Sequence, residues 1–382
     1  MPSAASAQRQ GQVVAKQFKS FAKAMSEFSK NPKKFRGKPQ LPGYKNRYRT
    51  FCVGRNGYRI TNGLLTITGA EEIGFCPVPV RCCKNQVFNA KADEAVAGDL
   101  RIVAMGNSFI IELTYIVKQE DINNKIMLNP SQALIADLGV NNFATFVSTK
   151  PGVMPLLVKG GMLKSLNQRY NKQTAELRAN KQYEHIRIKG FRRYRQMRDL
   201  LHKASRAAIN YCPAHDLGKL VIGLNTSWKQ EVKLGKKNNQ NFVMLPHGVF
   251  VEMLKYKAQE YGIEVIVREE SYTSKAGSLD FDPIPNYDPN KEKQANYEFS
   301  GTRPKRGLYV SGNGRKLNAD INGAINIGRK ALGDEWLKRL LELDEGFVDK
   351  PTVIRNLHER LNIGSLLEMG VRPHETSRVS VR

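Results

Sequence analysis

Apolar side chains recur at helical spacing near the start of the chain, between about residues 8 and 29. Lysines occupy positions between them, so the pattern predicts an amphipathic helix. The run SKNPKKFRGKPQLPGYKNRYR then ends the pattern with three prolines and many cations. Such a run is typical of a solvated connector, but its interleaved aromatic and basic side chains suit contacts with phosphates and bases equally well.

Between Thr50 and about Ile122, short β-branched runs are separated by turn residues. In NGYRITNGLLTITG two Asn-Gly pairs flank such runs, and GNSFIIELTYIV has the length and composition of a strand. We therefore expect a small β-barrel or sandwich in this part of the chain.

Beyond Pro130, apolar runs of strand length alternate with stretches of helical period. A polar loop is expected between Ser274 and Asn318. Three consecutive strands followed by alternating helix and strand indicate a mixed α/β layer. The predicted strands are ALIADLGV, FATFVS, PLLVKG, KLVIGL and IEVIVREE, and the predicted helices are the stretch from LKSLNQRY to AINYC, FVEMLKYKAQEYG, NADINGAINIGRKAL and DEWLKRLLEL.

The balance of charge adds a functional expectation to this picture. Lys and Arg number 61 against 35 Asp and Glu, a net charge of +26, while the 41% of apolar residues suffice for a folded core. A chain this basic repels itself and is usually matched by a polyanionic partner, so nucleic acid is the expected ligand. No apolar stretch approaches the roughly 20 residues of a membrane span, so no membrane partner is expected.

Two aspartates follow or begin apolar elements. Asp137 comes directly after the apolar run LIA of a predicted buried strand, where an ionised carboxylate is costly unless it is paired or bound to a metal. Asp320 lies in the first turn of the predicted helix NADINGAINIGRKAL, on the same edge as Ala324 and Ile327, so it faces a packed surface. Ordinary interpretations remain: Asp137 as the start of a turn, and Asp320 as a favourable charge at a helix N-terminus.

Two glutamates, Glu269 and Glu270, end the predicted strand IEVIVREE. Alternation along a strand puts Glu269 on the face of Val265 and Val267 and Glu270 on the opposite face. Taken alone, the pair is typical of a solvated strand end, and alternation does not choose between the two.

Taken together, a strand aspartate, a strand-end glutamate and a helix-borne aspartate are what a two-metal phosphodiester site requires. Two hard cations need several carboxylate oxygens within a few ångströms, because one ion activates the attacking water and the other stabilises the leaving oxygen. We therefore expect Asp137, Asp320 and one glutamate of the pair to bind two Mg²⁺ ions, beside positive charge that holds the substrate backbone.

The segments LIADLGVNNFATFV, EESYTSK and NADINGAINI, in this order, resemble the three RuvC-type blocks of the TnpB (OrfB) transposon-encoded nucleases, to which the miniature type V CRISPR effectors are related. The resemblance implies an α/β RNase H-like (RuvC) nuclease domain after a small wedge-like, oligonucleotide-binding-type β-barrel and a short N-terminal helical segment. It implies guide-RNA-directed, Mg²⁺-dependent cleavage of DNA next to a short flanking motif. The implied partners are a guide RNA derived from the transposon end and double- and single-stranded target DNA, in a cytoplasmic, nucleoid-associated prokaryotic setting.

By the same resemblance, Asp137 matches the first catalytic aspartate and Asp320 the last. Most of the family carries its catalytic glutamate on the strand that reads KLVIGL here, where this chain has Gly223. In an RNase H-like sheet this strand lies between the Asp137 strand and IEVIVREE, so a glutamate from the farther strand must span about 9.6 Å. Because glycine has no side chain, Gly223 leaves that path open for Glu269 or Glu270, and the resemblance favours Glu270.

Four segments are expected from composition and resemblance together: residues 1–40, a remnant of a helical recognition lobe; 41–128, the β-barrel; 129–332, the nuclease domain with a loop insertion at 274–318; and 333–382, a helical tail of unknown role. The start of the chain lacks the first barrel strand and much of the helical lobe of the family.

No zinc is expected. The five cysteines of the chain form no CxxC pair, and their odd number and spacing indicate reduced thiols in the cytoplasm. Many relatives carry two CxxC pairs in the insertion, whereas here Gly277 and Asp280 stand where the first pair would fall and residues 274–318 contain no cysteine.

Basic and aromatic side chains in three further runs are expected to contact phosphates or stack on bases, although a solvated surface explains many such residues as well. The candidate nucleic-acid contacts are Lys33, Lys34, Arg36, Lys45, Arg47, Arg49, Arg187, Arg192, Arg193, Arg195, Trp228, Lys229, Arg303, Lys305 and Arg306.

Three functions are compatible with these patterns. The first is an RNA-guided, Mg²⁺-dependent DNA endonuclease encoded by a transposon. The second is a guide-RNA-directed DNA-binding protein whose nuclease site is inactive, suggested by Gly223 and the short N-terminal part. The third is a basic RNA-binding protein without either activity.

Overall fold

The computed structural model describes residues 3–43, 50–62, 64–71, 74, 76–79, 96–105, 108–116, 127–224, 244–286, 297–343 and 351–358. The chain divides into two compact units, Met1–Gln119 and Glu120–Arg382. No helix among the described residues is long and apolar enough to span a membrane.

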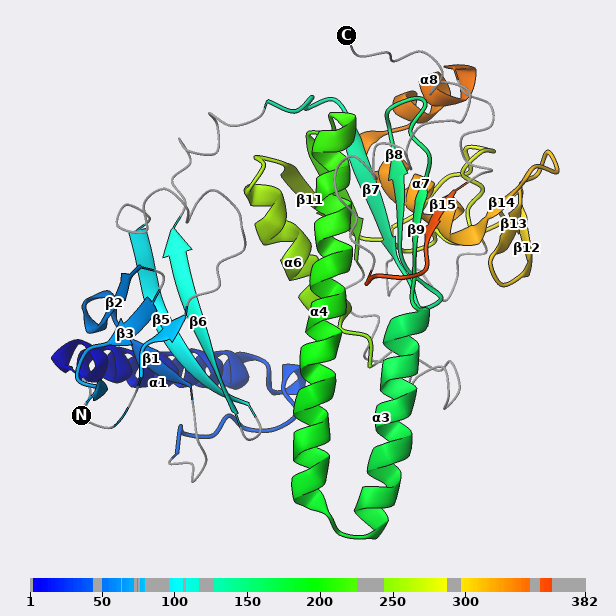
Figure 1. The fold of residues 1–382 in the computed structure, drawn as a ribbon. Helices are drawn as coiled ribbons and strands as arrows, with labels where there is room; N and C mark the ends of the chain where they lie inside the picture. Colours follow the sequence, from blue (N-terminus) through cyan, green and yellow to red (C-terminus); the bar gives the residue numbers. More distant parts are fainter. Residues whose placement is uncertain are drawn as a thin grey trace. The chain divides into compact units, whose positions relative to one another are not determined.

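The first unit combines one long helix with two small antiparallel sheets (Figure 1). Helix α1 (Ala4–Lys30) confirms the helix predicted over residues 8–29, and the Ser3 side chain caps it by accepting from the amide of Ser6. The sheets are β1-β5-β6 and β2-β3-β4. Their strands are β1 (Phe51–Val53), β2 (Tyr58–Thr61), β3 (Leu64–Ile67), β4 (Val78–Pro79), β5 (Val96–Met105) and β6 (Ser108–Ile116), with single-turn helices at Pro32–Lys34 and Arg55–Gly57.

A small apolar core holds the described part of this unit together. Val53, Leu65 and Leu100 are almost fully buried in it, and the hydroxyl of Tyr58 donates to the carbonyl of Gly98 over 2.7 Å. The chain is therefore rich in strands here, as predicted. Closure of the two sheets into a barrel stays a prediction.

The second unit is built on a six-stranded sheet in the order β11-β10-β7-β8-β9-β15. β7, β10 and β11 run parallel to one another, β8 is antiparallel to both of its neighbours, and β15 pairs with β9 in parallel. The position of the KLVIGL strand between the Asp137 strand and IEVIVREE is therefore confirmed. The strands are β7 (Ala133–Leu138), β8 (Asn142–Ser148), β9 (Leu156–Lys159), β10 (Lys219–Gly223), β11 (Glu264–Arg268) and β15 (Thr352–Ile354).

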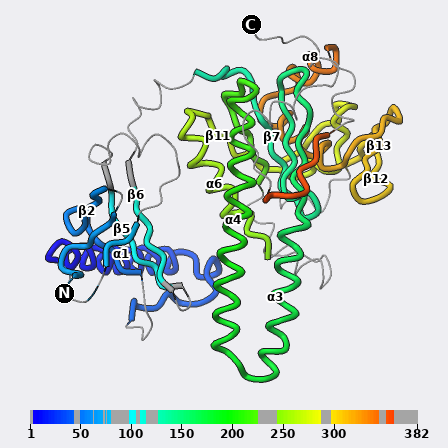
Figure 2. Tube along the Cα trace, viewed as in Figure 1, coloured from blue at the N-terminus to red at the C-terminus, as the bar shows by residue number. Residues whose placement is uncertain are grey.

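Helices cover both faces of this sheet (Figures 1 and 2). The long predicted helical stretch is two antiparallel helices, α3 (Gly161–Ala179) and α4 (Tyr183–His215), because the turn between them places Lys181 in the left-handed region at φ 54°. α4 and α6 (His247–Gln259) lie on one face, and α7 (Ala319–Leu332) and α8 (Glu335–Leu343) on the other.

Alternation along β7 shows how one strand serves both faces. Leu134 and Ala136 are buried in the cluster that includes α4 and α6, whereas Ala133 and Ile135 are buried in the cluster that includes α7. Both clusters are apolar, which explains why β7 has an almost continuous apolar sequence. By the same alternation, Asp137 lies on the α7 face.

Two sequence predictions need correction in this unit. The expected polar loop between Ser274 and Asn318 contains a small antiparallel sheet of β12 (Thr302–Lys305), β13 (Leu308–Val310) and β14 (Lys316–Asn318). Strand β11 ends at Arg268, so Glu269 and Glu270 follow the strand instead of lying on it. The strand was overestimated because the glutamates have no partner residues in β10, whose ladder with β11 ends at the Gly223–Arg268 pair.

Candidate active site

Asp137 lies near the end of β7 and faces the N-terminal half of α7. A Cβ placed at Gly323 would come within 2.8 Å of Asp137 Oδ2, so only glycine lets the helix pack this closely against the carboxylate. Burial, and then the nearby carboxylates of Glu270 and Asp320, raise the pKa of Asp137 well above its ordinary value. The structure therefore brings three carboxylates predicted from the sequence into electrostatic contact.

Glu270 reaches this group by crossing Gly223. A Cβ placed at Gly223 would come within 3.0 Å of Glu270 Oε2 and within 2.3 Å of Ile327 Cδ1. This is the path that the sequence predicted for a glutamate two strands away from Asp137. Burial, and then the charge of Glu269, raise the pKa of Glu270 to about 7, although the charge of Lys330 opposes this shift.

Glu269 is held in a different way. Its Oε2 accepts from Lys330 Nζ at 2.8 Å and its Oε1 accepts from the amide of Ser271 at 2.7 Å. Burial alone would raise the pKa of Glu269, but the bonds from Lys330 and Ser271 outweigh burial and lower it. The structure thus separates the two glutamates: Glu270 lies over Gly223 toward Asp137, and Glu269 is paired with a lysine.

Asp320 is fixed at the first turn of α7. Asn318 caps the helix by accepting from the Asp320 amide at 2.9 Å. The Asp320 carboxylate accepts from Asn142 Nδ2 at 2.6 Å, and a guanidinium nitrogen of Arg303 lies 3.9 Å from its other oxygen. Asn142 in turn accepts from Lys159 Nζ at 2.7 Å, so a chain of polar contacts orients this carboxylate.

A buried hydroxyl completes the described surroundings of Asp137. Thr145 pairs with Asp137 across β7 and β8 and is 1% exposed. Within the described part of the chain, its Oγ1 has no hydrogen-bond partner. A buried polar atom without a partner next to a charged group is uncommon in a folded protein and indicates a place where a ligand or ion completes the polar contacts.

The described ranges contain no three Asp, Glu, His or Cys side chains arranged closely enough to hold a metal ion as they stand. Asp320 is turned toward Asn142 and Arg303. The role of Asp137, Glu270 and Asp320 as metal ligands stays a prediction.

Sequence reasoning did not identify Asn142, Thr145, Lys159 or Lys330. Lys330 ends a predicted helix, and nothing local links it to a glutamate 61 positions away in the chain. Asn142 was visible as part of the polar pair after LGV, which had been interpreted as a turn. In the structure Asn142 is the first residue of β8 and donates to Asp320, a contact that the local sequence does not reveal.

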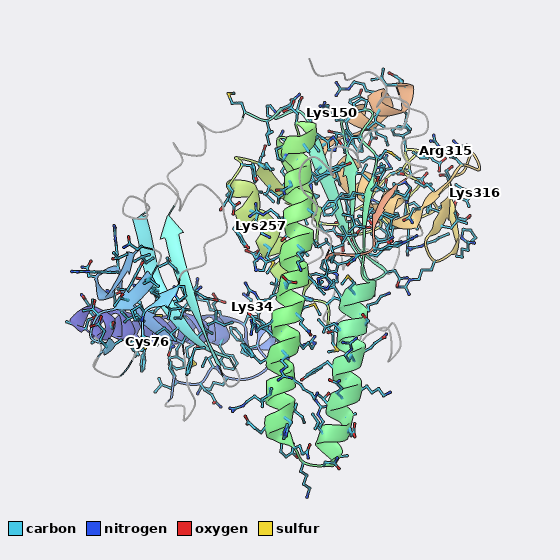
Figure 3. All side chains as sticks on the ribbon, viewed as in Figure 1. Lys34, Cys76, Lys150, Lys257, Arg315 and Lys316 are labelled. Atoms are coloured by element: carbon cyan, nitrogen blue, oxygen red, sulfur yellow. The ribbon has the colours of Figure 1, made fainter. Side chains whose placement is uncertain are left out.

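The predicted nucleic-acid contacts are spread over both units. Lys33, Lys34 and Arg36 are exposed after α1, and Arg303, Lys305 and Arg306 are exposed on the small sheet, which also carries Arg315 and Lys316 (Figure 3). On α4, Arg187, Arg192 and Arg195 are exposed, while Arg193 is half-buried and donates to Asn167 at 2.7 Å. Lys45, Arg47, Arg49, Trp228 and Lys229 lie outside the described residues.

Two protein-family models match consecutive parts of the chain. The model of a family described as "Probable transposase" matches residues 114–229, and the model described as "Cas12f1-like, TNB domain" matches residues 247–327. A viral relative, the TnpB-like protein ORF457 of Acidianus two-tailed virus, is 27% identical over 121 residues. The match covers 31% of this chain and 22% of that relative.

Two solved structures resemble the fold weakly. The Cas12f1–sgRNA–target DNA complex gives a TM-score of 0.39 at 15% identity, over 77% of this chain and 70% of that one. A CRISPR-Cas12f ternary complex gives a TM-score of 0.39 at 15% identity, over 75% of this chain and 61% of that one. A TM-score of this size does not establish a common fold.

The two family models, adjacent and in order, define the class as a transposase-associated protein related to Cas12f1. The family models and the viral relative, which is described as TnpB-like, support the similarity of this chain to the TnpB family. The resemblance deduced from the three sequence blocks is thereby confirmed.

Proposed function

We propose that this protein is an RNA-guided, metal-dependent DNA endonuclease encoded by a transposon. The observation that carries the proposal is the convergence of Asp137, Glu270 and Asp320, which come from β7, the end of β11 and the start of α7. The arrangement of β7, β10 and β11 supports an RNase H-like (RuvC) fold for the second unit.

The side-chain types of the three candidate ligands suit Mg²⁺, but their carboxylates would have to move closer together to hold one ion. Carboxylate oxygens are the ligands that this hard cation prefers, and burial, followed by the charges of Glu270 and Asp320, raises the pKa of Asp137. A cation would offset the cost of burying these charges, and Thr145 Oγ1, which has no partner in the described part of the chain, is available to bond a metal-bound water. Asp137, Glu270 and Asp320 would hold the metal, and the two-ion chemistry supplies an activated water and a stabilised leaving oxygen.

The other residues of the site bind and orient. Asn142, the first residue of β8, accepts from Lys159 and donates to the Asp320 carboxylate on α7, so it orients that carboxylate. Arg303 contacts Asp320 from the small sheet and is 38% exposed at its side chain, so it can also contact a phosphate of the DNA backbone. Gly223 and Gly323 let the backbone approach the carboxylates closely, because an added Cβ would lie 3.0 Å from Glu270 Oε2 and 2.8 Å from Asp137 Oδ2.

Guide RNA and target DNA are the proposed partners. The exposed arginines on α4 and the basic small sheet offer phosphate contacts, in a chain with a net charge of +26. The α1 segment would contribute what remains of a helical recognition lobe, and the β-rich part of the first unit would act as the wedge-like domain. Such a protein works in the cytoplasm on nucleoid DNA.

The insertion before α7 is proposed to fold without zinc. Asp282 Oδ2 accepts from the amides of Gly277 at 2.7 Å and Ser300 at 3.0 Å, and its Oδ1 accepts from Ser300 Oγ at 2.8 Å. Asp280 Oδ2 accepts from the amide of Gly312 at 2.9 Å. Two carboxylates thus tie together both ends of the hairpin β12–β13, the work that a metal does in a zinc-bound loop.

The test is cleavage by the protein purified with its own RNA. The copurified RNA is sequenced, a DNA target matching its guide segment is supplied with Mg²⁺, and products are resolved on denaturing gels. Cleavage is expected for the unaltered protein and is expected to fall at least a hundredfold in Asp137→Asn and Glu270→Gln, with target binding retained.

Glu264→Gln is the matched control, because Glu264 lies at the start of the same strand β11, is 60% exposed at its side chain and has its carboxylate 3.7 Å from Lys219 Nζ. It is expected to keep most of the cleavage. Tight, guide-dependent target binding without cleavage in any divalent metal would instead identify a DNA-binding protein with an inactive site. Copurified RNA with no transposon-end sequence would favour a general RNA-binding protein.

A further inference from the structure

The two glutamates lie beyond the last pairing of the sheet, so the β-ladder does not position them. The β10–β11 ladder ends at the pair Gly223–Arg268, followed by one more backbone bond from the Leu224 amide to the Arg268 carbonyl at 2.9 Å. Which glutamate turns toward Asp137 therefore depends on contacts outside the sheet.

Lys330, near the end of α7, makes three such contacts. Its Nζ donates to Glu269 Oε2 at 2.8 Å and to the carbonyls of Ser271 and Pro285 at 3.2 Å each. The Lys330 side chain is only 6% exposed. A buried ammonium with three acceptors is fully satisfied and holds its partners in one arrangement. The Glu269 side chain before Glu270 and the Ser271 carbonyl after it are thereby tied to α7.

The same helix fixes the chain after Glu270. Asn326 Nδ2 donates to the carbonyls of Thr273 at 2.9 Å and Ala276 at 2.7 Å. Thr273 returns to Glu270, since its Oγ1 donates to the Glu270 carbonyl at 2.8 Å. Ile327, between Asn326 and Lys330 in sequence, fills the space above Gly223. One face of α7 therefore holds the turn and also borders the path of the Glu270 side chain.

We propose that Lys330 is a positioning residue for the candidate active site: by pairing with Glu269, it fixes the turn 269–271 so that Glu270 is the carboxylate aimed across Gly223. The inference deepens the proposed function and rests on it. The inference gives each of the two adjacent glutamates a separate role: Glu269 binds Lys330, and Glu270 is the proposed metal ligand. The hydrogen bonds of Lys330 go to Glu269, Ser271 and Pro285, so it positions Glu270 through Glu269 and the turn, and its charge acts on Glu270 as well.

The competing interpretation is an ordinary salt bridge that stabilises the fold and nothing else. Lys330→Met keeps the aliphatic stem and removes the ammonium, while Lys330→Arg keeps the charge. Lys338→Met is the matched control, because Lys338 makes a 2.8 Å pair with Glu335 on the exposed side of α8. All variants are studied as full-length protein with its guide RNA.

Two measurements separate the interpretations: the affinity for Mn²⁺ as a probe of the carboxylates, followed by electron paramagnetic resonance, and the cleavage rate at saturating target. Lys330→Met is expected to weaken Mn²⁺ binding at least fivefold and slow cleavage at least tenfold, with target affinity changed less than twofold. Lys330→Arg is expected to recover most of both, and Lys338→Met to change neither.

A second variant guards against simple unfolding. In Glu269→Gln/Lys330→Met, the half-buried Glu269 carboxylate is not left without its lysine, so the double variant is expected to melt within a few degrees of the unaltered protein and still to bind Mn²⁺ more weakly. Unchanged Mn²⁺ affinity in Lys330→Met, while the unaltered protein binds Mn²⁺, would overturn the inference alone. Absence of Mn²⁺ binding by the unaltered protein would overturn the proposed function, and the inference with it.

Discussion

The carboxylate of Glu270 occupies the space above Gly223, with Oε2 only 3.0 Å from where a Cβ would stand on that glycine. Gly223 on β10 has no side chain, and the Glu270 side chain, which starts just beyond the end of β11, extends over it. A glutamate that comes from two strands away from Asp137 needs a gap in the strand between, and only glycine leaves one at this point.

Gly223→Ala is therefore expected to impair both stability and cleavage. Its Cβ would meet Ile327 Cδ1 at 2.3 Å and Glu270 Oε2 at 3.0 Å, so both side chains must move. We expect the free energy of unfolding to fall by about 1–3 kcal/mol, as measured with denaturant, and cleavage to slow at least tenfold. Gly248→Ala in α6 is the control, because a Cβ there meets nothing within 4 Å. Equal cleavage in the two variants would contradict the crossing.

Asp137→Asn is expected to stabilise the metal-free protein while it abolishes cleavage. Burial and the charges of Glu270 and Asp320 raise the pKa of Asp137, which means that its ionised form is disfavoured in the folded state. An uncharged amide of the same shape removes that repulsion, so we expect the free energy of unfolding in a chelator to rise by about 1 kcal/mol. Thermal unfolding with and without Mg²⁺ measures the effect. A lower melting temperature of the variant in chelator would contradict it.

Asp282→Asn tests the zinc-free insertion. The asparagine keeps one acceptor oxygen and replaces the other by a donor, which opposes the amides of Gly277 and Ser300. The expected loss in unfolding free energy is about 1–3 kcal/mol, with faster amide exchange in residues 300–312. Asp280→Asn is the milder control, since one bond from Gly312 is at stake. If a zinc chelator lowered the melting temperature of the unaltered protein, the insertion would contain zinc after all.

His202 on α4 predicts a loss of stability in mild acid. Burial, and then the charges of Lys257 and Arg198, lower the pKa of His202 to about 4. Lys257, labelled in Figure 3, donates to the His202 carbonyl at 2.9 Å and so keeps its charge close. The unfolded histidine has a pKa of about 6.5, so the unfolded chain takes up a proton first as the pH falls.

The sign follows from that difference. The contribution of His202 to stability is fully present above pH 6.5 and is lost as the pH falls from 6.5 toward 4, by about 1 kcal/mol once solvent screening of this half-buried group is allowed for. Denaturant unfolding at several pH values is expected to show a flatter profile for His202→Gln than for the unaltered protein. His185→Gln, at an exposed position in the same helix, is expected to leave the profile unchanged. Parallel profiles for all three proteins would rule the explanation out.

Much of the second unit was predictable because its signals are local. β7 and β8 have apolar and β-branched runs bounded by turn residues, and α7 carries its cap at Asn318 and its glycine at Gly333. The family resemblance then predicted which strands are neighbours. The break between α3 and α4 was not predictable in this way, since Lys181 adopts a left-handed conformation without the glycine that normally signals it.

The choice between Glu269 and Glu270 shows where local reasoning ends. Alternation places the two on opposite faces, but which face carries the site depends on where α7 packs. In the structure, Ile266 packs against the α7 cluster and Val265 against the other, so the parity of Ile266 is that of the site. Glu270 has the same parity but lies beyond the end of β11, where contacts from α7 hold the turn. The sequence shows that Val265 and Ile266 lie on opposite faces of the strand, but it does not show which of these faces packs against α7.

Strand β15 was not predicted either, because three residues after a proline carry little signal and their partner β9 lies almost 200 positions earlier. Its place in the sheet has a consequence for biosynthesis. A ribosome makes five strands of the sheet by Arg268 and the sixth only at Ile354, so β9 presents its unpaired edge to the cell while α7, α8 and the residues up to Lys350 are still being made. During this interval the nascent chain is open to misassociation, until the last strand pairs with β9.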